Sequence, residues 1–166
     1  AFPSTKGAIV HGNSDEHDES GFTSEDPTIT TMMIDKRLRK LVTLKKEIKE
    51  RDVETIKLHG PEDAPATIIS WGSTKGPLKE AIRLLQTEGK VVNFVQILYL
   101  HPFPKDKVEE VLSKAKKIII VENNSTSQLS SLLREHTLRK VDHKILKYDG
   151  RPFSPFALSE QIKEVL

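Results

Sequence analysis

The chain has 166 residues, enough for one domain with a real core and an appendage but too few for two domains of ordinary size. Its 26 basic and 24 acidic residues leave a formal net charge of +2, so no strong overall field draws the protein to nucleic acid or to an anionic membrane. The absence of cysteine excludes disulfide bonds, a thiolate nucleophile, and cysteine ligation of zinc or an iron-sulfur cluster by this chain.

Residues 1–27 contain several glycines and prolines but no sustained apolar period, which predicts an irregular segment. No apolar run approaches the roughly 20 residues that span a bilayer, and the opening lacks the features of a signal peptide, so we expect a cytoplasmic protein with no membrane contact. Because the chain begins in loop-like sequence without an initiating methionine, we also expect it to be a segment of a longer polypeptide.

The irregular segment carries a cluster of carboxylates with two histidines nearby: His11, Asp15, Glu16, His17, Asp18, Glu19, Glu25 and Asp26. Such a cluster can hold a hard cation or accept a basic partner. The spacing matches neither the EF-hand loop nor a His-based zinc motif, so we predict no metal site. We favour a solvated or interface-facing loop.

From Thr28 to about Arg51, apolar residues recur at steps of three and four and predict one long amphipathic helix. The hydroxyl of Thr28 can cap its first turn. The outer face is basic, which is typical either of a phosphate or RNA contact or of a solvated helix surface. The helix has no aromatic side chains interleaved for base stacking, so we favour the solvated surface.

Between Ala66 and Gly150 one pattern repeats: a short apolar run, a polar loop, then an amphipathic helix. The apolar runs are TIISWG, VVNFVQILYL, KIIIVEN and HKILKYDG, and a last helix opens near Ser154 or Pro155. This alternation predicts a three-layer α/β domain with a mostly parallel sheet over residues 61–166. Ligands of such sheets gather at the carboxyl ends of the strands, which directs attention to the loops GSTKG, HPFP, NNSTS and GRPFSP.

The loop GSTKG places Ser73 and Thr74 directly before a helix, where either side chain can cap it. Free backbone N–H groups at a helix start can also bind phosphate. The loop matches neither the Walker pattern nor G-x-G-x-x-G, so we favour a tight strand-to-helix turn over an anion site. In the next loop, His101 has no nucleophile or carboxylate at a recognisable spacing, and prolines on both sides hold Phe103 in place.

Glu122, Asn123 and Asn124 stand where the third of these strands gives way to a helix. Asn and Ser are good helix caps, and capping accounts for much of this cluster. Glu122 has two open interpretations, a hydrogen-bond anchor for a neighbouring loop or a ligand contact. Arg151, between Gly150 and Pro152, is a cation that can grip a carboxylate or an acidic loop of a partner.

The residues show no nucleophile-base pair, metal triad or dinucleotide fingerprint, so we expect no catalytic residue in this segment. Residues alone therefore predict an α/β interaction or ligand-binding domain with a charged N-terminal extension. One interpretation is a free-standing module that binds a phosphorylated ligand on the GSTKG and NNSTS loops.

Several motifs together carry a family resemblance: GNSDEHDESGFTSEDP, SWGSTKG, YLHPFPKDKVEEVL, VENNSTSQL and KYDGRPFSP. In this order, and over the whole chain, they resemble the C-terminal part of the alpha subunit of 2-oxoacid:ferredoxin oxidoreductases, especially the 2-oxoglutarate type. The resemblance implies a transketolase C-terminal-like domain at residues 61–166, with residues 1–60 as the tail of a preceding domain and a helical connector. It implies a role mainly in the structure and assembly of the subunit.

Enzymes of that family convert a 2-oxoacid and coenzyme A into acyl-CoA and carbon dioxide and pass the electrons to ferredoxin. The resemblance implies thiamine diphosphate, magnesium and an iron-sulfur cluster in the whole hetero-oligomeric complex, and none bound by this segment alone. It implies a beta subunit as partner, since the diphosphate, metal and cluster ligands of the family lie there. The candidate ligand or interface residues are His17, Asp18, Glu19, Ser73, Thr74, Glu122, Asn123, Asn124 and Arg151.

The chain departs from the family at two places. The family often has T-G-Q-L where this chain has Thr126, Ser127, Gln128 and Leu129, which puts in doubt any role that needs a close backbone approach at Ser127. Ser20 replaces a more usual aromatic or acidic residue after the HDE motif, which weakens the transfer of fine specificity to the acidic loop.

Overall fold

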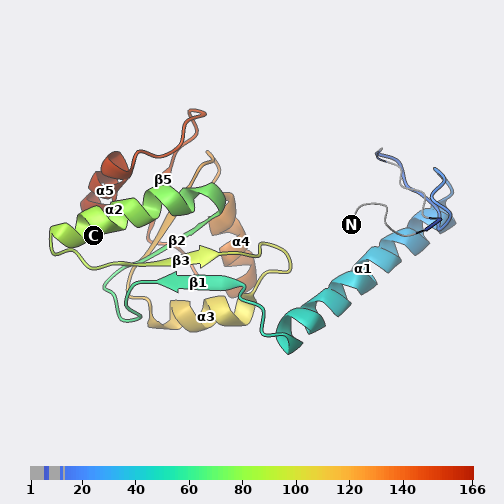
Figure 1. Ribbon diagram of the computed structural model, residues 1–166, viewed down its shortest axis with the longest axis horizontal. Coiled ribbons are helices and arrows are strands. Elements are labelled where there is room, and N and C mark those ends of the chain that lie inside the picture. The colour runs from blue at the N-terminus through green and yellow to red at the C-terminus, as the bar shows by residue number, and fades with distance from the viewer. Residues whose placement is uncertain (1–5, 8–11, 13) are drawn as a thin grey trace. The chain divides into compact units, whose positions relative to one another are not determined.

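The computed structural model describes residues 6, 7, 12 and 14–166. The chain divides between Val53 and Glu54 into two compact units, an N-terminal unit and an α/β unit (Figure 1). Each unit has its own architecture, and the predicted site residues are divided between the two.

The N-terminal unit consists of a turn followed by helix α1 (Pro27–Glu50). The side chain of Asp26 caps the helix, because its Oδ1 accepts hydrogen bonds from the N–H groups of Thr28 at 2.8 Å and Ile29 at 3.0 Å. The predicted cap at Thr28 is therefore wrong. The carboxylate two residues earlier is better placed for the first free N–H groups, and Pro27 occupies the first helical position, where no N–H is needed.

The α/β unit contains one five-stranded sheet, made of β1 (Ile56–His59), β2 (Thr67–Trp71), β3 (Asn93–Ile97), β4 (Ile118–Glu122) and β5 (His143–Leu146). The strand order is β1-β3-β2-β4-β5. Every neighbouring pair is parallel except β1 and β3. The predicted mostly parallel sheet is thus confirmed, with the four predicted apolar runs as its parallel strands.

The antiparallel edge strand β1 is the element that sequence patterning missed. None of its four residues is buried, and two apolar residues that alternate with a lysine and a histidine give a weak signal. Pairing with the fully buried strand β3 secures it. The expected domain boundary between residues 60 and 61 falls just after this strand.

Four helices cover the sheet: α2 (Lys75–Thr87), α3 (Lys105–Lys114), α4 (Gln128–Thr137) and α5 (Pro155–Glu164). Side chains of α2 and α5 share one buried cluster with one face of the sheet, and side chains of α3 and α4 share a second cluster with the other face. The sheet therefore lies between two helical layers, as predicted (Figure 1).

Alternation along each strand divides the core between the two faces. In β2, Ile68 belongs to the cluster under α2 and α5, and its neighbour Ile69 belongs to the cluster under α3 and α4. Phe94 and Val95 divide in the same way in β3. Both faces of these strands are buried, which explains why the sequence shows continuous apolar runs there.

The chain direction across the sheet reverses at β2. From β2 the chain passes through α2 to β3 on one side, then returns through α3 to β4 on the other side of β2. The loops after β2 and β4 thus lead to helices on opposite faces of the sheet, which opens a crevice at their carboxyl ends. This topological switch point is where open α/β sheets bind ligands.

Candidate functional site

A cleft of about 560 Å³ lies at the carboxyl ends of β2, β4 and β5. It is lined by Ser73, Asn123, Lys147, Tyr148, Gly150, Arg151 and Pro152. Three of the predicted loops therefore meet in one place, and three predicted residues, Ser73, Asn123 and Arg151, line the same cleft. Because β2 and β4 are hydrogen-bonded neighbours, the parallel sheet itself brings Ser73 and Asn123 together.

A hydrogen bond joins the two loops that flank the switch point. The hydroxyl of Thr74, which is 4% exposed, donates to Asn123 Oδ1 at 3.1 Å. Thr74 occupies the N-cap position of α2, yet its side chain makes no capping hydrogen bond. The prediction that Ser73 or Thr74 caps this helix is therefore wrong for Thr74, because its hydroxyl instead joins the loops after β2 and β4.

Glu122 ends β4 as a fully buried carboxylate. Oε2 accepts hydrogen bonds from Asn124 Nδ2 at 2.8 Å and from the N–H of Leu129 at 2.8 Å. Oε1 accepts from the Ser127 hydroxyl at 3.1 Å and from the N–H of Ser130 at 3.2 Å. With four donors around it, the carboxylate anchors the loop and caps the start of α4, where negative charge is favourable.

The residues between Glu122 and α4 are organised by this anchor. Asn124 Oδ1 also accepts a hydrogen bond from the N–H of Gln128 at 3.2 Å, so both ends of its amide are used within the loop. Ser127 has φ 56°, in the left-handed region that favours glycine. The glycine usual in the family would adopt this conformation without strain.

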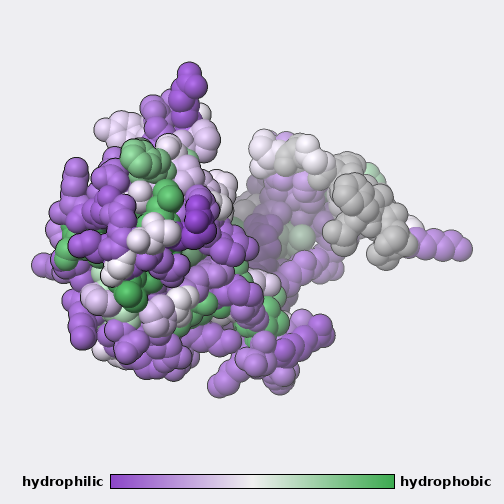
Figure 2. Space-filling model, turned by 60° about the vertical axis from the view of Figure 1, so that its left-hand side comes forward, coloured by the Kyte–Doolittle hydropathy of each residue, from purple (hydrophilic) through white to green (hydrophobic). Residues whose placement is uncertain are grey.

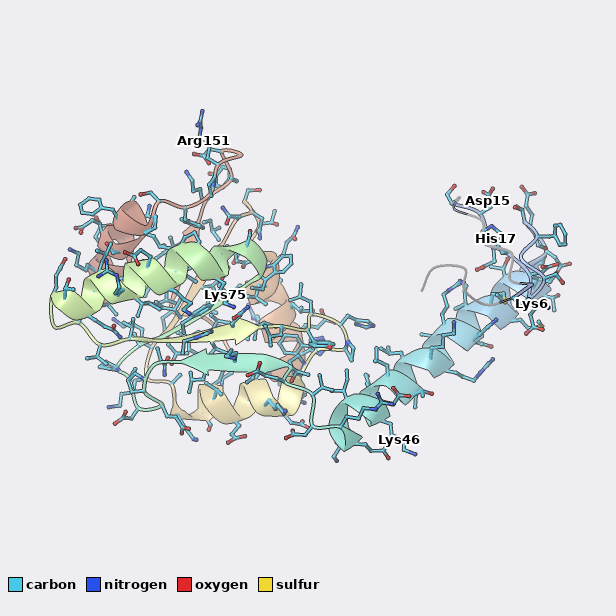
Figure 3. All side chains as sticks on the ribbon, viewed as in Figure 1. Lys6, Asp15, His17, Lys46, Lys75 and Arg151 are labelled. Atoms are coloured by element: carbon cyan, nitrogen blue, oxygen red, sulfur yellow. The ribbon has the colours of Figure 1, made fainter. Side chains whose placement is uncertain are left out.

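The loop after β5 supplies the charged groups of the cleft. Lys147 Nζ lies 2.5 Å from Asp149 Oδ2, and the backbone N–H of Arg151 donates to Asp149 Oδ1 at 3.1 Å. The hydrogen bond from Lys147, followed by that from the Arg151 backbone, lowers the pKa of Asp149. Arg151 projects outward from this loop (Figure 3). Its guanidinium has no ion-pair partner among the described residues.

His17, Asp18 and Glu19 belong to the N-terminal unit. Asp18 Oδ1 accepts hydrogen bonds from the backbone N–H groups of Ser20 at 2.8 Å and Phe22 at 3.0 Å, so its carboxylate stabilises a tight turn. Within the same unit, Figure 3 shows Asp15 and His17 on this segment. His11, predicted as part of the same cluster, lies outside the described residues.

An ion pair between Glu16 and Arg37 ties the acidic segment to α1. Arg37 donates to Glu16 through its two terminal guanidinium nitrogens, Nη1 at 2.9 Å and Nη2 at 2.5 Å. The hydrogen bonds from Arg37, with a further one from the His17 backbone, lower the pKa of Glu16 to about 2. Among residues 6, 7, 12 and 14–166, no group of three or more His, Asp or Glu side chains is placed to hold a metal ion.

Lys147 and Tyr148 also line the cleft, although neither was among the predicted site residues. Their position directly after an apolar strand was the sequence feature that could have indicated a place in the cleft. The HPFP loop after β3 does not line this cleft. Its Phe103 instead stacks on His136 of α4, with ring centroids 4.7 Å apart, which confirms that the ring is held.

The visible surface of the α/β unit is mainly hydrophilic. Figure 2 shows hydrophilic residues over most of the visible face of the α/β unit, with hydrophobic residues in separate patches. In the part of the chain that the structure describes, no helix is long and apolar enough to cross a membrane.

Comparison with known proteins identifies the family. The family of pyruvate:ferredoxin oxidoreductase core domain II matches residues 64–155, more than half of the chain. The chain is 42% identical over 91% of its length to subunit alpha of 2-oxoacid:ferredoxin oxidoreductase 2 from Aeropyrum pernix, of which it covers 23%. It is 38% identical over 96% of its length to the alpha subunit of a Saccharolobus solfataricus 2-oxoacid:ferredoxin oxidoreductase, of which it covers 25%.

A solved structure agrees with these sequence matches. The 2-oxoglutarate:ferredoxin oxidoreductase from Magnetococcus marinus, with 2-oxoglutarate, coenzyme A and succinyl-CoA bound, is similar over 99% of this chain and 28% of its own, with a TM-score of 0.67 and 30% identity. The chain spans about a quarter of the length of the relatives it matches. None of these similarities favours the free-standing phosphate-binding module. The chain belongs to the pyruvate:ferredoxin oxidoreductase core domain II family, and its relatives are alpha subunits of 2-oxoacid:ferredoxin oxidoreductases.

Proposed function

We propose that this chain is the C-terminal part of the alpha subunit of a cytoplasmic 2-oxoacid:ferredoxin oxidoreductase. The whole enzyme would convert a 2-oxoacid, coenzyme A and oxidised ferredoxin into acyl-CoA, carbon dioxide and reduced ferredoxin. The observation that carries the proposal is the 42% identity over 91% of the chain to one such alpha subunit. The 2-oxoglutarate enzyme from Magnetococcus marinus makes 2-oxoglutarate the first substrate to test.

Within that enzyme the segment would have a role in structure and assembly. Glu122, the most deeply buried of the predicted site residues, spends its hydrogen-bonding capacity on the loop and helix that follow it. Thr74 and Asn124 likewise bond within the domain. We propose residues 61–166 as the transketolase C-terminal-like domain and residues 1–60 as the tail and connector of a preceding domain.

The cofactors of the reaction would be thiamine diphosphate, magnesium and an iron-sulfur cluster, held by other parts of the complex. Two observations on this chain support that placement for the iron-sulfur cluster and for the metal. It has no cysteine to ligate a cluster, and its described residues include no cluster of three His, Asp or Glu side chains for a metal. The beta subunit is the partner that we propose for these ligands.

The test is to recover the full-length parent protein from its native source through an affinity tag. The eluate is assayed for viologen reduction with 2-oxoglutarate and coenzyme A, and in parallel with pyruvate and coenzyme A. We expect reduction that requires both substrates, together with a cysteine-rich, thiamine-containing partner. A lone protein with neither cofactor nor activity would refute the proposed function.

A further inference from the structure

We infer that the cleft formed by Ser73, Asn123, Tyr148 and Arg151 is a docking site for an aspartate or glutamate side chain of a separate subunit. This inference rests on the proposed function, because it takes the chain to be part of a multi-subunit enzyme. The juxtaposition that carries it is a guanidinium without a counter-charge beside polar donors at the switch point of the sheet.

The net charge of the residues around the cleft favours a ligand group with a single negative charge. Lys147 and Asp149 neutralise each other across 2.5 Å, which leaves Arg151 as the one unbalanced charge of this loop. One positive charge matches a carboxylate, whereas a phosphate ester would bring nearly two negative charges. A guanidinium also matches a carboxylate in shape, because it can donate two parallel hydrogen bonds to the two oxygens.

The other lining residues supply neutral donors. Asn123 accepts from Thr74 through Oδ1, so its amide nitrogen is the end that remains for a ligand. The hydroxyl groups of Ser73 and Tyr148 have no hydrogen-bond partner among the described residues, and both side chains are exposed. A carboxylate has lone pairs for several donors at once, so it can use these groups together with Arg151.

The exposure of Arg151 argues for a protein partner over a small acid. Its side chain projects outward from the β5–α5 loop, and the residue is exposed (Figure 3). An ion pair in contact with water contributes only about 0–1 kcal/mol, too little to retain a small acid. A subunit that covers the cleft brings its own buried area and excludes water, which strengthens the pair.

The cleft is also held in shape before any partner arrives. The Thr74–Asn123 hydrogen bond fixes the loops after β2 and β4 to each other, and the four hydrogen bonds to Glu122 fix the loop that contains Asn123. The carboxylate of Asp149 accepts the backbone N–H of Arg151, which fixes the base of the arginine. Such preorganisation reduces the entropy that docking would otherwise cost.

The first test compares Arg151→Gln with Arg83→Gln in the complete, affinity-purified parent complex. Arg83 is the matched control, since it is an exposed arginine of the same unit whose ion pair with Glu80 lies on α2, outside the cleft. We expect Arg151→Gln to raise the Kd of subunit association at least about 10-fold in mass photometry and to remove part of its salt dependence. Arg83→Gln should leave the Kd unchanged. Equal Kd values for the two variants would overturn the inference.

The second test reports directly on whether the cleft is covered. The chain has no cysteine, so Ser73→Cys places a thiol in the cleft and Glu80→Cys places a control thiol on α2. We expect maleimide labelling of the thiol introduced by Ser73→Cys, read by mass spectrometry, to slow at least about 10-fold when the parent alpha subunit binds its partner, because a docked surface excludes the reagent. Unchanged labelling on assembly, or protection already complete in the alpha subunit alone, would exclude a separate subunit as the occupant.

A third arm distinguishes a free acid from a protein side chain. Acetate, glutamate and 2-oxoglutarate are titrated into the parent alpha subunit by calorimetry. We expect no Arg151-dependent binding below about 1 mM, and tighter binding would make the cleft a small-molecule site and reject the inference. None of these readouts uses catalysis. An inactive complex with Arg151-dependent assembly would reject only the proposed function, and an active complex insensitive to Arg151→Gln would reject only the docking site.

Discussion

Glu122→Gln replaces one oxygen of the buried carboxylate by an amide nitrogen that can only donate. Glu122 is fully buried, and its two oxygens accept four hydrogen bonds. If the amide nitrogen takes the place of Oε2, it faces two donors at once, Asn124 Nδ2 and the N–H of Leu129. If it takes the place of Oε1, the Ser127 hydroxyl can turn to accept, and only the N–H of Ser130 loses its acceptor. The second orientation of the amide therefore has the lower free energy.

The cost follows from that orientation. One buried N–H without an acceptor costs about 1–3 kcal/mol, and the remaining hydrogen bonds lose the strength that the negative charge gives them. We expect Glu122→Gln to lower the free energy of unfolding of the chain by about 2–3 kcal/mol, although glutamine has nearly the same shape as glutamate. A structural anchor predicts this loss, whereas a ligand-binding carboxylate would tolerate the change in the free protein.

Urea unfolding followed by circular dichroism measures the loss as a lower midpoint with an unchanged slope. Glu80→Gln is the control, because Glu80 is a partly exposed glutamate paired with Arg83, and its replacement should leave the midpoint in place. Hydrogen exchange should also accelerate at Leu129 and Ser130. The anchoring role of Glu122 would be refuted if its glutamine variant matched the wild-type midpoint and kept slow exchange at both amides.

Three further measurements test other parts of the structure. Ser127 has φ 56° and donates a hydrogen bond to Glu122. Ser127→Ala should therefore lower the free energy of unfolding in urea by about 1–2 kcal/mol, whereas in Ser127→Gly the relief of backbone strain should offset most of the lost hydrogen bond. Equal losses in both variants would contradict this account. Because the folded pKa of Glu16 is about 2, against an ordinary value of 4.5, its pairing with Arg37 should stabilise fully above pH 4.5 and be lost as the pH falls toward 2. Carboxyl NMR titration checks this, and an ordinary midpoint for Glu16 would disprove the pairing. Helix α1 has no buried residue, so its amides should exchange faster than those of α2 in the isolated chain, and equal protection would show that its apolar stripe is covered there.

The sequence by itself determined the fold class and the edge of the sheet at which the candidate site lies. Continuous apolar runs such as residues 118–121, bounded by polar loops, are typical of strands covered on both faces, and the helical periodicity between them supplies the two covers. Parallel strands bring their carboxyl ends to one edge, so the loops containing Ser73, Asn123 and Arg151 had to lie on the same side of the sheet. These properties depend on local patterns along the chain, which one sequence contains in full.

Only the tertiary structure decided how the polar side chains are used. The sequence left Glu122 either as an anchor or as a ligand contact, and the choice depends on donors from α4 that reach it only when the loop folds back. Ser73 or Thr74 was predicted to cap the following helix, yet the hydroxyl of Thr74 donates to a partner 49 residues away. Strand β1 is likewise secured by β3, which lies more than thirty residues later in the chain. Hydrogen bonds between distant residues depend on where the folded chain places both partners, and local propensity contains no information about that distance.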